Sequence, residues 1–478
     1  MREPVAFPWD TADRDERLAG TEIYESPVHL IGNTPLVKLG RLAAEAGMPC
    51  PLVIKWEVTN PGGSSKDRPA LEMILAAERS GELRPGGTIV EPTSGNTGVG
   101  LAIVAAHRGY KCVFVTTTKV APEKIDLLRA YGAEVVVCDV AVPPEDPDSY
   151  YSTAERLVKE IPGAYRPNQY ANPNNPLSHQ KTTGPEIWRQ TAGRVTHFVA
   201  GAGTCGTITG AARFLKSKNP DIKIIAADPD ASVYSGGSGR PYLIEGVGED
   251  FFPAAWDPSV LDEIIACSDE EAYLMARRVA ATEAVLLGSS GGLAIAGALK
   301  LKDRLTAHDL VVVLIPDSGR GYLSRVYNDE WMANYGFVRE CDECVAAILD
   351  TRAEGLPPLL YVNPDDTVRQ AIDVMRRNGV SQLPVCKNTP PFAVAEVSGS
   401  VSELALMNAV FHDSAIMDTP VGAVMGPKLP TIGIGQKLSK AVEMLDHAPA
   451  VLVLSGGRPL SVLSRTDVLS YLEVAAHG

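Results

Sequence analysis

Residues 88–116, TIVEPTSGNTGVGLAIVAAHRGYKCVFVT, hold an apolar run, a polar turn, a run of small and aliphatic residues, and a second apolar run. The β-branched residues at 88–91 and 111–116 predict strands, and residues 96–108 predict a helix between them. Both strand segments are almost continuously apolar rather than alternating, which is typical of parallel strands covered by helices on both faces. The stretch therefore predicts an α/β fold.

The same alternation continues on either side of this stretch. The pattern predicts a helix at 121–131 and further strands at 134–138, 197–200, 222–227 and 310–315. Alternation of strands and helices over this length predicts open, largely parallel sheets.

The composition argues against several classes of function. The 478 residues include 44 Lys and Arg against 58 Asp and Glu, a formal net charge of −14, which disfavours binding to nucleic acid. The sequence holds no apolar run of about 18 residues, so we expect no membrane span. Residues 1–19 lack the apolar core of a signal peptide. We therefore expect neither a nucleic-acid partner nor a membrane partner.

The eight cysteines lie mostly in apolar contexts, as at Cys138. This pattern predicts reduced, buried thiols and a cytoplasmic location. The one close pair, Cys341 and Cys344, lacks the further ligands that a structural zinc ion requires. We predict no metal and interpret the pair as incidental, with reversible oxidation as the alternative.

The composition changes after residue 328, and two similar units follow it. The units are offset by about 64 to 70 residues, which indicates a tandem duplication rather than a longer repeat array. The domain boundaries that we predict are an N-terminal extension at 1–24, a large domain at 25–335, a linker at 336–355, and two repeated domains at 356–415 and 416–478.

The segment NPGGSSKDR at 60–68 places one lysine, Lys66, after a glycine turn and before a predicted helix. The partial positive charge at a helix N-terminus is expected to lower the pKa of the Lys66 amine. A less protonated amine can form a Schiff base with an aldehyde. The alternative is an exposed lysine in the first turn of the helix.

Three further segments each follow a predicted strand. Residues 91–98 and 199–207 lead into helices, where backbone N–H groups can bind a carboxylate or a phosphate. Residues 91–98 also fit a simple capping turn. The pair Gly201 and Gly203 is weak evidence for a dinucleotide and fits a phosphate cradle better. Residues 315–321 end the last strand, which is either a ligand-binding edge or a plain turn.

These four segments, in this order, resemble those of the fold-type-II pyridoxal-phosphate (PLP) enzymes, which have a tryptophan synthase β-like fold. Within that group the chain is most similar to bacterial members of the cysteine synthase/cystathionine β-synthase family, over nearly all of 25–335. The repeated units resemble a C-terminal tandem CBS-domain (Bateman) module. Further matching motifs are IGNTP at 31–35, QYANPNNP at 169–176, TGPEI at 183–187 and EGVGEDF at 245–251.

The resemblance implies a role for each motif residue. Lys66 would be the catalytic residue and hold PLP as a Schiff base, Asn96 would bond the 3′-oxygen of the cofactor, and Ser318 would face its pyridine nitrogen. The residues implied to grip the phosphate are Gly203, Thr204, Cys205, Gly206 and Thr207. The residues implied to bind or border the substrates are Thr93, Ser94, Thr97, Gln169, Tyr170 and Gly246.

The resemblance also implies a reaction. A neutral hydroxyl at the pyridine nitrogen favours loss of a β-leaving group, and Lys66 would move the α-proton. L-serine and L-homocysteine would give L-cystathionine and water through an aminoacrylate, a step of transsulfuration. The alternatives are an O-acetylserine sulfhydrylase (cysteine synthase), a related β-substituted alanine synthase, or, from another class, an adenosyl-ligand sensor with an inert catalytic half.

Tandem CBS domains imply an adenosyl ligand such as S-adenosylmethionine, and the alternative is a dimerisation or linker module without a ligand. The family implies a homodimer or homotetramer. We predict no haem, because no matching cysteine–histidine arrangement lies near the N-terminus. The residues implied for the adenosyl ligand are Ser400, Ser402, Ser464, Thr466 and Asp467.

The phosphate loop departs from the family pattern at Cys205, where the family usually has glycine. A backbone N–H is still available there, but a Cβ now occupies the position. If the residue has a positive φ, the side chain is expected to strain the backbone.

Overall fold

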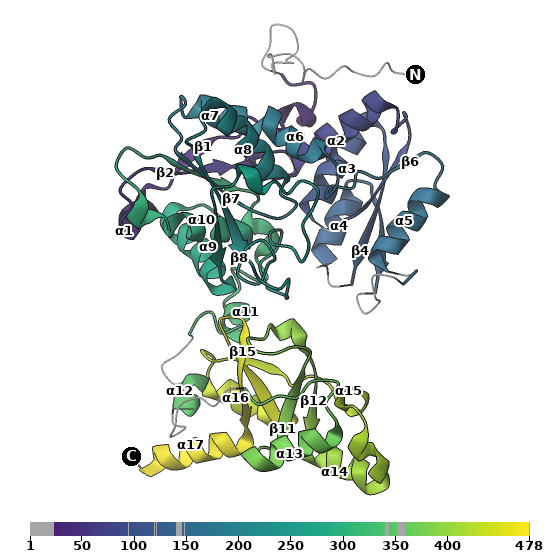
Figure 1. Cartoon of the computed structure of the whole chain (residues 1–478), viewed down its shortest axis with the longest axis vertical. Coiled ribbons are helices and arrows are strands. Elements are labelled where there is room, and N and C mark those ends of the chain that lie inside the picture. The colour runs from purple at the N-terminus through teal and green to yellow at the C-terminus, as the bar shows by residue number, and fades with distance from the viewer. Residues whose placement is uncertain are drawn as a thin grey trace. The chain divides into compact units, whose positions relative to one another are not determined.

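The computed structural model describes residues 23–93, 95–118, 120, 122–139, 146–147, 149–339, 344–350 and 359–477. The chain divides into two compact units (Figure 1). The first unit comprises residues up to 237, 245–267 and 278–321, and the second comprises 238–244, 268–277 and 322–478. Within the described residues, none of the helices combines the length and the apolar composition that a membrane crossing needs.

The first unit contains a four-stranded parallel sheet with the order β5-β4-β3-β6. Helices α3 and α4 lie on one side of it and α5 on the other (Figure 1). Neighbouring residues of β4 point to opposite faces, so Phe114 packs against α3 and Val115 against α5. The elements are β3 (Thr88–Pro92), α3 (Asn96–Arg108), β4 (Lys111–Thr117), α4 (Pro122–Ala130), β5 (Glu134–Cys138), α5 (Tyr150–Glu160) and β6 (Ala164–Tyr165).

A second sheet of the same unit has six strands in the order β1-β2-β10-β7-β8-β9. All neighbours are parallel except β1 and β2. Helix α8 covers one face, and the small residues of α10 let it approach the other closely, since a Cβ on Gly297 would lie 3.0 Å from that of Ala227. The strands are β1 (Leu36–Lys38), β2 (Leu52–Trp56), β7 (His197–Gly201), β8 (Lys223–Pro229), β9 (Glu263–Cys267) and β10 (Val311–Ile315).

The predicted α/β class and the largely parallel sheets are confirmed. The strands predicted at 88–91, 111–116, 134–138, 197–200, 222–227 and 310–315 all form, within two residues of the predicted ends. Strands β1, β2, β6 and β9 and the division into two sheets were not predicted from the sequence. The remaining helices of this unit are α1 (Gly40–Ala46), α2 (Asp67–Ser80), α6 (Asn174–Lys181), α7 (Thr183–Gln190), α8 (Gly206–Lys218) and α10 (Ser289–Leu299), with α9 (Asp269–Glu283) shared between the units.

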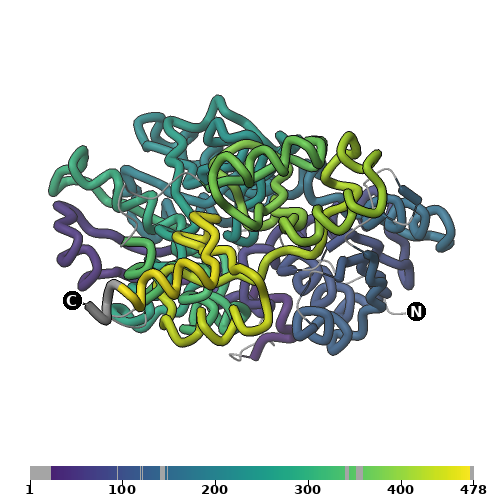
Figure 2. The backbone as a smooth tube through the Cα atoms, turned by 90° about the horizontal axis from the view of Figure 1, so that it is seen from below, coloured from purple at the N-terminus to yellow at the C-terminus, as the bar shows by residue number. Residues whose placement is uncertain are grey.

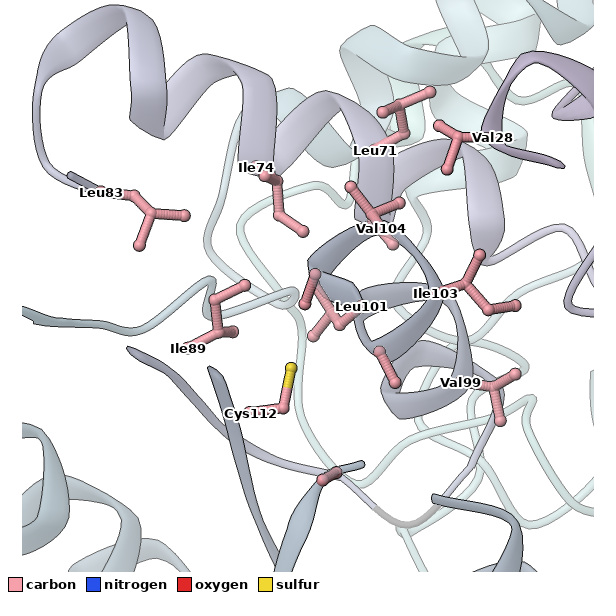
Figure 3. Packing of buried hydrophobic residues seen from close by; sticks show 14 of the residues in the cluster. Val28, Leu71, Ile74, Leu83, Ile89, Val99, Leu101, Ile103, Val104 and Cys112 are labelled. Atoms are coloured by element: carbon pink, nitrogen blue, oxygen red, sulfur yellow. The ribbon is translucent and has the colours of Figure 1, made fainter. Parts of the chain in front are cut away.

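A hydrophobic cluster between α2, α3 and the first sheet fixes where two functional segments start (Figure 3). Leu71 and Leu101 are almost fully buried in it, and burying each such side chain contributes about 1.5–3 kcal/mol. Gly100 allows α3 to approach the start of α2, because a Cβ there would lie 3.0 Å from the carbonyl oxygen of Lys66. The packing therefore brings the N-termini of α2 and α3 to the same region.

A buried ionic network lies at the start of α2. The Arg68 guanidinium donates to the carboxylates of Glu57 (2.6 Å) and Glu186 (2.8 Å), and all three side chains are almost fully buried. Lys55, also buried, donates to Glu186 at 2.7 Å. Because each charge has an opposite partner, the network joins β2, α2 and α7 without leaving a lone buried ion.

The second unit repeats one motif, two helices flanking an antiparallel strand pair, as the duplication predicts. The repeats lie side by side (Figure 2) and share a cluster that includes Phe392 and Leu452. Cys344 is buried, whereas Cys341 lies outside the described residues. The repeats are α13 (Val368–Asn378), β11 (Gln382–Cys386), β12 (Val397–Ser402) and α14 (Glu403–His412), then α16 (Leu438–His447), β14 (Ala450–Ser455), β15 (Arg458–Ser464) and α17 (Arg465–His477).

Three short α-helices and one short strand also belong to the unit, namely α11 (Asp329–Asn334), α12 (Val345–Asp350), α15 (Val421–Val424) and β13 (Thr431–Gly433). Residues 238–244 also belong to it. Arg240 anchors this segment by donating to the Glu396 carboxylate at 2.5 and 2.7 Å. The N–H groups of Leu243 and Ile244 donate to Asp269.

Candidate active site

Lys66 is the residue that caps the N-terminus of α2. Its segment is fastened to the residues that follow β10, because the Ser65 N–H donates to the Pro316 carbonyl at 2.8 Å and Ser64 pairs with Asp317 as an isolated bridge. Gly63 makes the preceding turn with φ of +75°. Two segments about 250 residues apart in the chain therefore hold the lysine between them, at the carboxyl end of a sheet strand.

The pKa of the Lys66 amine is lowered from its ordinary value, as predicted, but the main cause is burial rather than the helix N-terminus. The negative charges of Asp317 and Glu249 oppose this shift. Lys66 as a whole nevertheless keeps part of its surface exposed to solvent. The amine is thus both reachable and less costly to deprotonate than an ordinary lysine.

Asn96 is the first residue of α3, and its side-chain amide donates to Asp317 at 2.8 Å. Asp317 is buried and follows β10 closely. An amide has two N–H groups, so the bond to Asp317 fixes the side chain while leaving the second N–H of Asn96 for a ligand. Asp317 lies within the motif at 315–321, but no role was predicted for it from the sequence.

The predicted carboxylate-binding residues form a second cluster at the start of α3. The Thr97 hydroxyl donates to the side-chain carbonyl of Gln169 at 2.7 Å. The buried carboxylate of Glu91 accepts the N–H groups of Asn168 and Gln169, and thereby positions Gln169. Thr93 is buried nearby in the chain. Ser94 lies outside the described residues.

The predicted phosphate loop, residues 203–207, leads into α8 and needs two glycines. A Cβ on Gly203 would lie 2.8 Å from the carbonyl oxygen of Gly246, and one on Gly206 would lie 1.9 Å from the side-chain oxygen of Asn175. Asn175 also donates to Thr204 Oγ1 at 3.1 Å and to the Gln169 carbonyl at 2.8 Å. Asn175 therefore connects the phosphate loop to the carboxylate-binding cluster.

Thr207, in the first turn of α8, contacts a buried histidine. The Thr207 Oγ1 and His179 Nε2 atoms are 3.1 Å apart, and His179 Nδ1 lies 2.8 Å from Thr183 Oγ1. Burial holds the pKa of His179 well below its usual range, so the ring is neutral. A neutral imidazole donates through one nitrogen and accepts through the other, which orients both hydroxyls.

Cys205 adopts a left-handed backbone with φ of +62°, as expected for a position that glycine usually occupies. The thiol is 3% exposed and donates to the Gly203 carbonyl at 3.3 Å. Burial raises the pKa of the Cys205 thiol to about 12, which leaves it protonated near neutral pH. The residue therefore contributes a strained backbone to the loop rather than a reactive thiolate.

We expect Cys205→Val to lower the free energy of unfolding by about 2 kcal/mol or more, because a β-branched side chain is poorly tolerated at positive φ. Cys205→Gly should stay within about 1 kcal/mol of the parent, since relief of strain is offset by the freedom of glycine in the unfolded chain. Urea unfolding of the three proteins tests this. A glycine variant as unstable as the valine variant would contradict the role of strain.

The other predicted residues lie at the edges of these clusters. Ser318 pairs with Leu287 as an isolated bridge, and its hydroxyl accepts the Arg320 N–H at 3.2 Å. Gly246 has φ of +80° and touches Gly203. Tyr170 follows Gln169 and hydrogen-bonds the Glu249 carboxyl.

The predicted adenosyl-ligand residues lie where strands β12 and β15 end. Ser464 donates its hydroxyl (2.6 Å) and its N–H (2.8 Å) to Asp467 in the first turn of α17, and Thr466 lies between them. Ser402 caps α14 by accepting the Ala405 N–H, while the Ser400 hydroxyl donates to the Pro427 carbonyl.

The residues of the first unit fit PLP. An amine of lowered pKa can bond the aldehyde, a helix N-terminus with two side-chain-free positions can take a phosphate, and Asn96 and Ser318 offer polar atoms for the ring. The loop is connected to the start of α3 by hydrogen bonds, because Asn175 donates to Thr204 and to the Gln169 carbonyl, and Thr97 donates to the Gln169 side chain. Among the described residues, no three His, Cys, Asp or Glu side chains are grouped to hold a metal ion.

Sequence reasoning missed the residues that support the site, namely Glu91, Asn175, His179, Glu249 and Asp317. Four of them lie inside motifs that it singled out, and that proximity was the available signal. Their roles depend on contacts between distant segments, such as the pair Asn96 and Asp317, which are 221 residues apart.

The fold and the site together define a class of enzyme. A family model described as "Pyridoxal-phosphate dependent enzyme" matches residues 28–317, which is more than half of the chain. A second model, described as "CBS domain", matches residues 354–410 and 421–474. The first match confirms PLP as the cofactor and the fold-type-II class, and the second confirms the tandem CBS module.

Similar proteins narrow this class of enzyme to one family. The cystathionine beta-synthase of Oryctolagus cuniculus is 42% identical over 369 residues, covering 75% of this chain and 67% of that protein. That of Dictyostelium discoideum is 33% identical, covering 92% and 91%. A solved O-ureido-L-serine synthase aligns with a TM-score of 0.61 and 36% identity over 64% of this chain and 96% of that chain. The chain therefore belongs to the cystathionine beta-synthase family of PLP-dependent enzymes.

Proposed function

We propose that this protein condenses L-serine with L-homocysteine to L-cystathionine and water. The observation that carries the proposal is the placement of Lys66, which is fastened beside Asp317 and the start of α3, with an amine of lowered pKa. The activity in the names of the relatives supports homocysteine as the second substrate.

PLP, when bound, withdraws electrons from the α-carbon of an amino acid and so acidifies its α-proton. Residues 203–207 would hold its phosphate at the N-terminus of α8, and Asn96 would donate to its 3′-oxygen. Thr97 and Gln169, already hydrogen-bonded to each other, would bind the substrate carboxylate. This binding would turn the α-proton toward the Lys66 amine, which would take it and later return it.

Ser318 would influence which reaction follows the removal of the α-proton. A carboxylate facing the pyridine nitrogen would keep it protonated and stabilise a full negative charge at the α-carbon, whereas a serine hydroxyl does not. Loss of the β-hydroxyl as the α-proton departs is then the favoured course. The same argument holds for serine with an acetylated hydroxyl.

The test is a competition between nucleophiles. The holoenzyme receives serine together with homocysteine and sulfide at equal concentration, and mass spectrometry identifies the products. We expect cystathionine to dominate. Cysteine as the main product would replace the proposal with a cysteine synthase, and an uncoloured protein that consumes nothing would indicate an inert catalytic half.

A related β-substituted alanine synthase is the second candidate. Its supporting observation is the 36% identity to the solved O-ureido-L-serine synthase, an enzyme named for another β-substituted product. The same experiment addresses it, because a nitrogen or oxygen nucleophile such as hydroxyurea can join the mixture. A ureido product in excess of cystathionine would favour this candidate.

We further propose that the CBS module binds an adenosyl ligand such as S-adenosylmethionine. The Asp467 carboxylate, held by Ser464 at the start of α17, supports this, since a carboxylate can accept both hydroxyls of a ribose. Calorimetry should show saturable heat with S-adenosylmethionine or AMP and its loss in Asp467→Ala. Absence of heat with both ligands in the parent protein would contradict the proposal.

We propose a homodimer or homotetramer with a cytoplasmic location. Exposed apolar side chains at helical spacing on α14 support self-association, namely Leu404, Met407 and Phe411, which are 65%, 57% and 85% exposed. The buried, free cysteines of the described residues support a reducing compartment. We also propose the domain boundaries predicted from the sequence, which are 1–24, 25–335, 336–355, 356–415 and 416–478.

A further inference from the structure

Glu249 lies in the segment 245–251, and its backbone is fixed on both sides. The Gly248 N–H donates to the Ala202 carbonyl at 2.6 Å, which ties the segment to the strand end before the phosphate loop. The Glu249 N–H donates to Ser232 Oγ at 3.2 Å, and its carbonyl accepts the Val233 N–H at 3.0 Å. These bonds fix the backbone at Glu249, and so the point from which its side chain leaves the chain.

The Glu249 carboxyl lies between two residues of the site. It hydrogen-bonds the hydroxyl of Tyr170, and its charge acts on the Lys66 amine. Tyr170 is itself held by Phe251, with ring centroids 5.3 Å apart, and it follows Gln169 in the chain. Glu249 therefore combines an acidic group with a fixed position next to both the lysine and the carboxylate-binding cluster.

The mechanism proposed above has no group that removes the proton of the second substrate. A thiol attacks as its thiolate, and an amino-acid thiol is mostly protonated at neutral pH. We propose that the Glu249 carboxylate accepts this proton as the incoming thiol reaches the β-carbon. This inference rests on the proposed function, since it concerns the second half of that reaction.

The chemistry balances without a further reactant. The S–H bond breaks and its proton passes to Glu249. The sulfur lone pair forms the C–S bond at the β-carbon, and the proton that Lys66 removed earlier returns to the α-carbon. Glu249 then releases its proton to water before the next turnover. The β-hydroxyl of serine left as water in the first half of the reaction by taking one proton from solvent, and the proton that Glu249 releases to solvent replaces it.

The ionisation of Glu249 suits this role. Burial raises the pKa of Glu249 to about 7, against the hydrogen bond from Tyr170, which lowers it. A base with a pKa near the working pH is the most effective kind. The charged or titratable groups that influence the Glu249 carboxyl are Lys66, Tyr151, Tyr170, Cys205, Asp228, Tyr234 and Asp250.

The experiment separates the two halves of the reaction in Glu249→Gln holoenzyme. Serine alone should change the absorbance spectrum as fast as in the parent protein. Consumption of that species by homocysteine should be slower by about 100-fold or more, the usual contribution of a general base. In the parent, the rate of the thiol step should increase as the pH rises through about 7, because Glu249 then loses its proton. This increase (the pH limb) should be absent in the variant.

Asp250→Asn is the matched control, because it removes one negative charge from the neighbouring, exposed position. It should retain both steps and the pH limb. A Glu249→Gln variant with an unchanged thiol step overturns the inference. A slower thiol step with homocysteine but not with 2-mercaptoethanol also overturns the inference. 2-Mercaptoethanol has a thiol but no ammonium group, so that result would mean that Glu249 binds the ammonium group of homocysteine. If the parent protein itself does not respond to serine, the proposed function fails instead.

Discussion

Replacing Lys66 with alanine is expected to abolish the reaction, with a fall in rate of at least about 10³-fold. The reason is that one amine has two tasks, bonding the aldehyde and moving the α-proton. Its neighbours Ser64 and Asp317 place it for both. Steady-state formation of cystathionine by Lys66→Ala and the parent measures the effect.

Lys38→Ala serves as the control, since Lys38 is an exposed lysine on β1. It should keep the parental rate. Circular dichroism of Lys66→Ala should match the parent, which shows that the lost rate is not lost fold. A Lys66→Ala enzyme that keeps a tenth or more of the parental rate would contradict the assignment, because general-base groups contribute about 10²-fold or more.

The largest effect on stability is expected at Arg68. Arg68→Met leaves the carboxylates of Glu57 and Glu186 buried with one cation, Lys55, in place of two. Removing one partner from a buried ionic network lowers the free energy of unfolding by about 3–5 kcal/mol. Urea unfolding of the first unit, followed by tryptophan fluorescence, should report a loss of this size.

Arg79→Met is a matched control on the same helix. Arg79 pairs with Glu72, but its own side chain is 50% exposed, so its loss should cost less than about 1 kcal/mol. Equal losses for the two variants would show that burial of the network does not determine its contribution. An Arg68→Met protein as stable as the parent would lead to the same conclusion.

Local sequence patterns were sufficient to predict individual strands and helices, but not how the strands assemble into sheets. Residues 88–116 predicted two strands and a helix because apolar periodicity and turn residues act over short distances. The division into two sheets depends on which strands pair, and β10 pairs with β2, more than 250 residues earlier in the chain. No local signal specifies such a partner.

The candidate site shows the same limit. Lys66 could be singled out from its glycine turn, yet burial rather than the helix N-terminus lowers its pKa, and burial follows from packing across the unit. Asn175 and Glu249 lie in recognised motifs, but their contacts with Gly206 and Tyr170 appear only in the folded chain. Cys205 could be anticipated, because a side chain in a glycine position has a local backbone consequence.

The most direct test of the central claim is to fix the cofactor to the protein chemically. Parent protein incubated with PLP is reduced with borohydride, digested, and its labelled peptides are sequenced by mass spectrometry. The account predicts one labelled position, Lys66, and no label at that peptide when serine is added before reduction. A label on another lysine, or none at all, would contradict it.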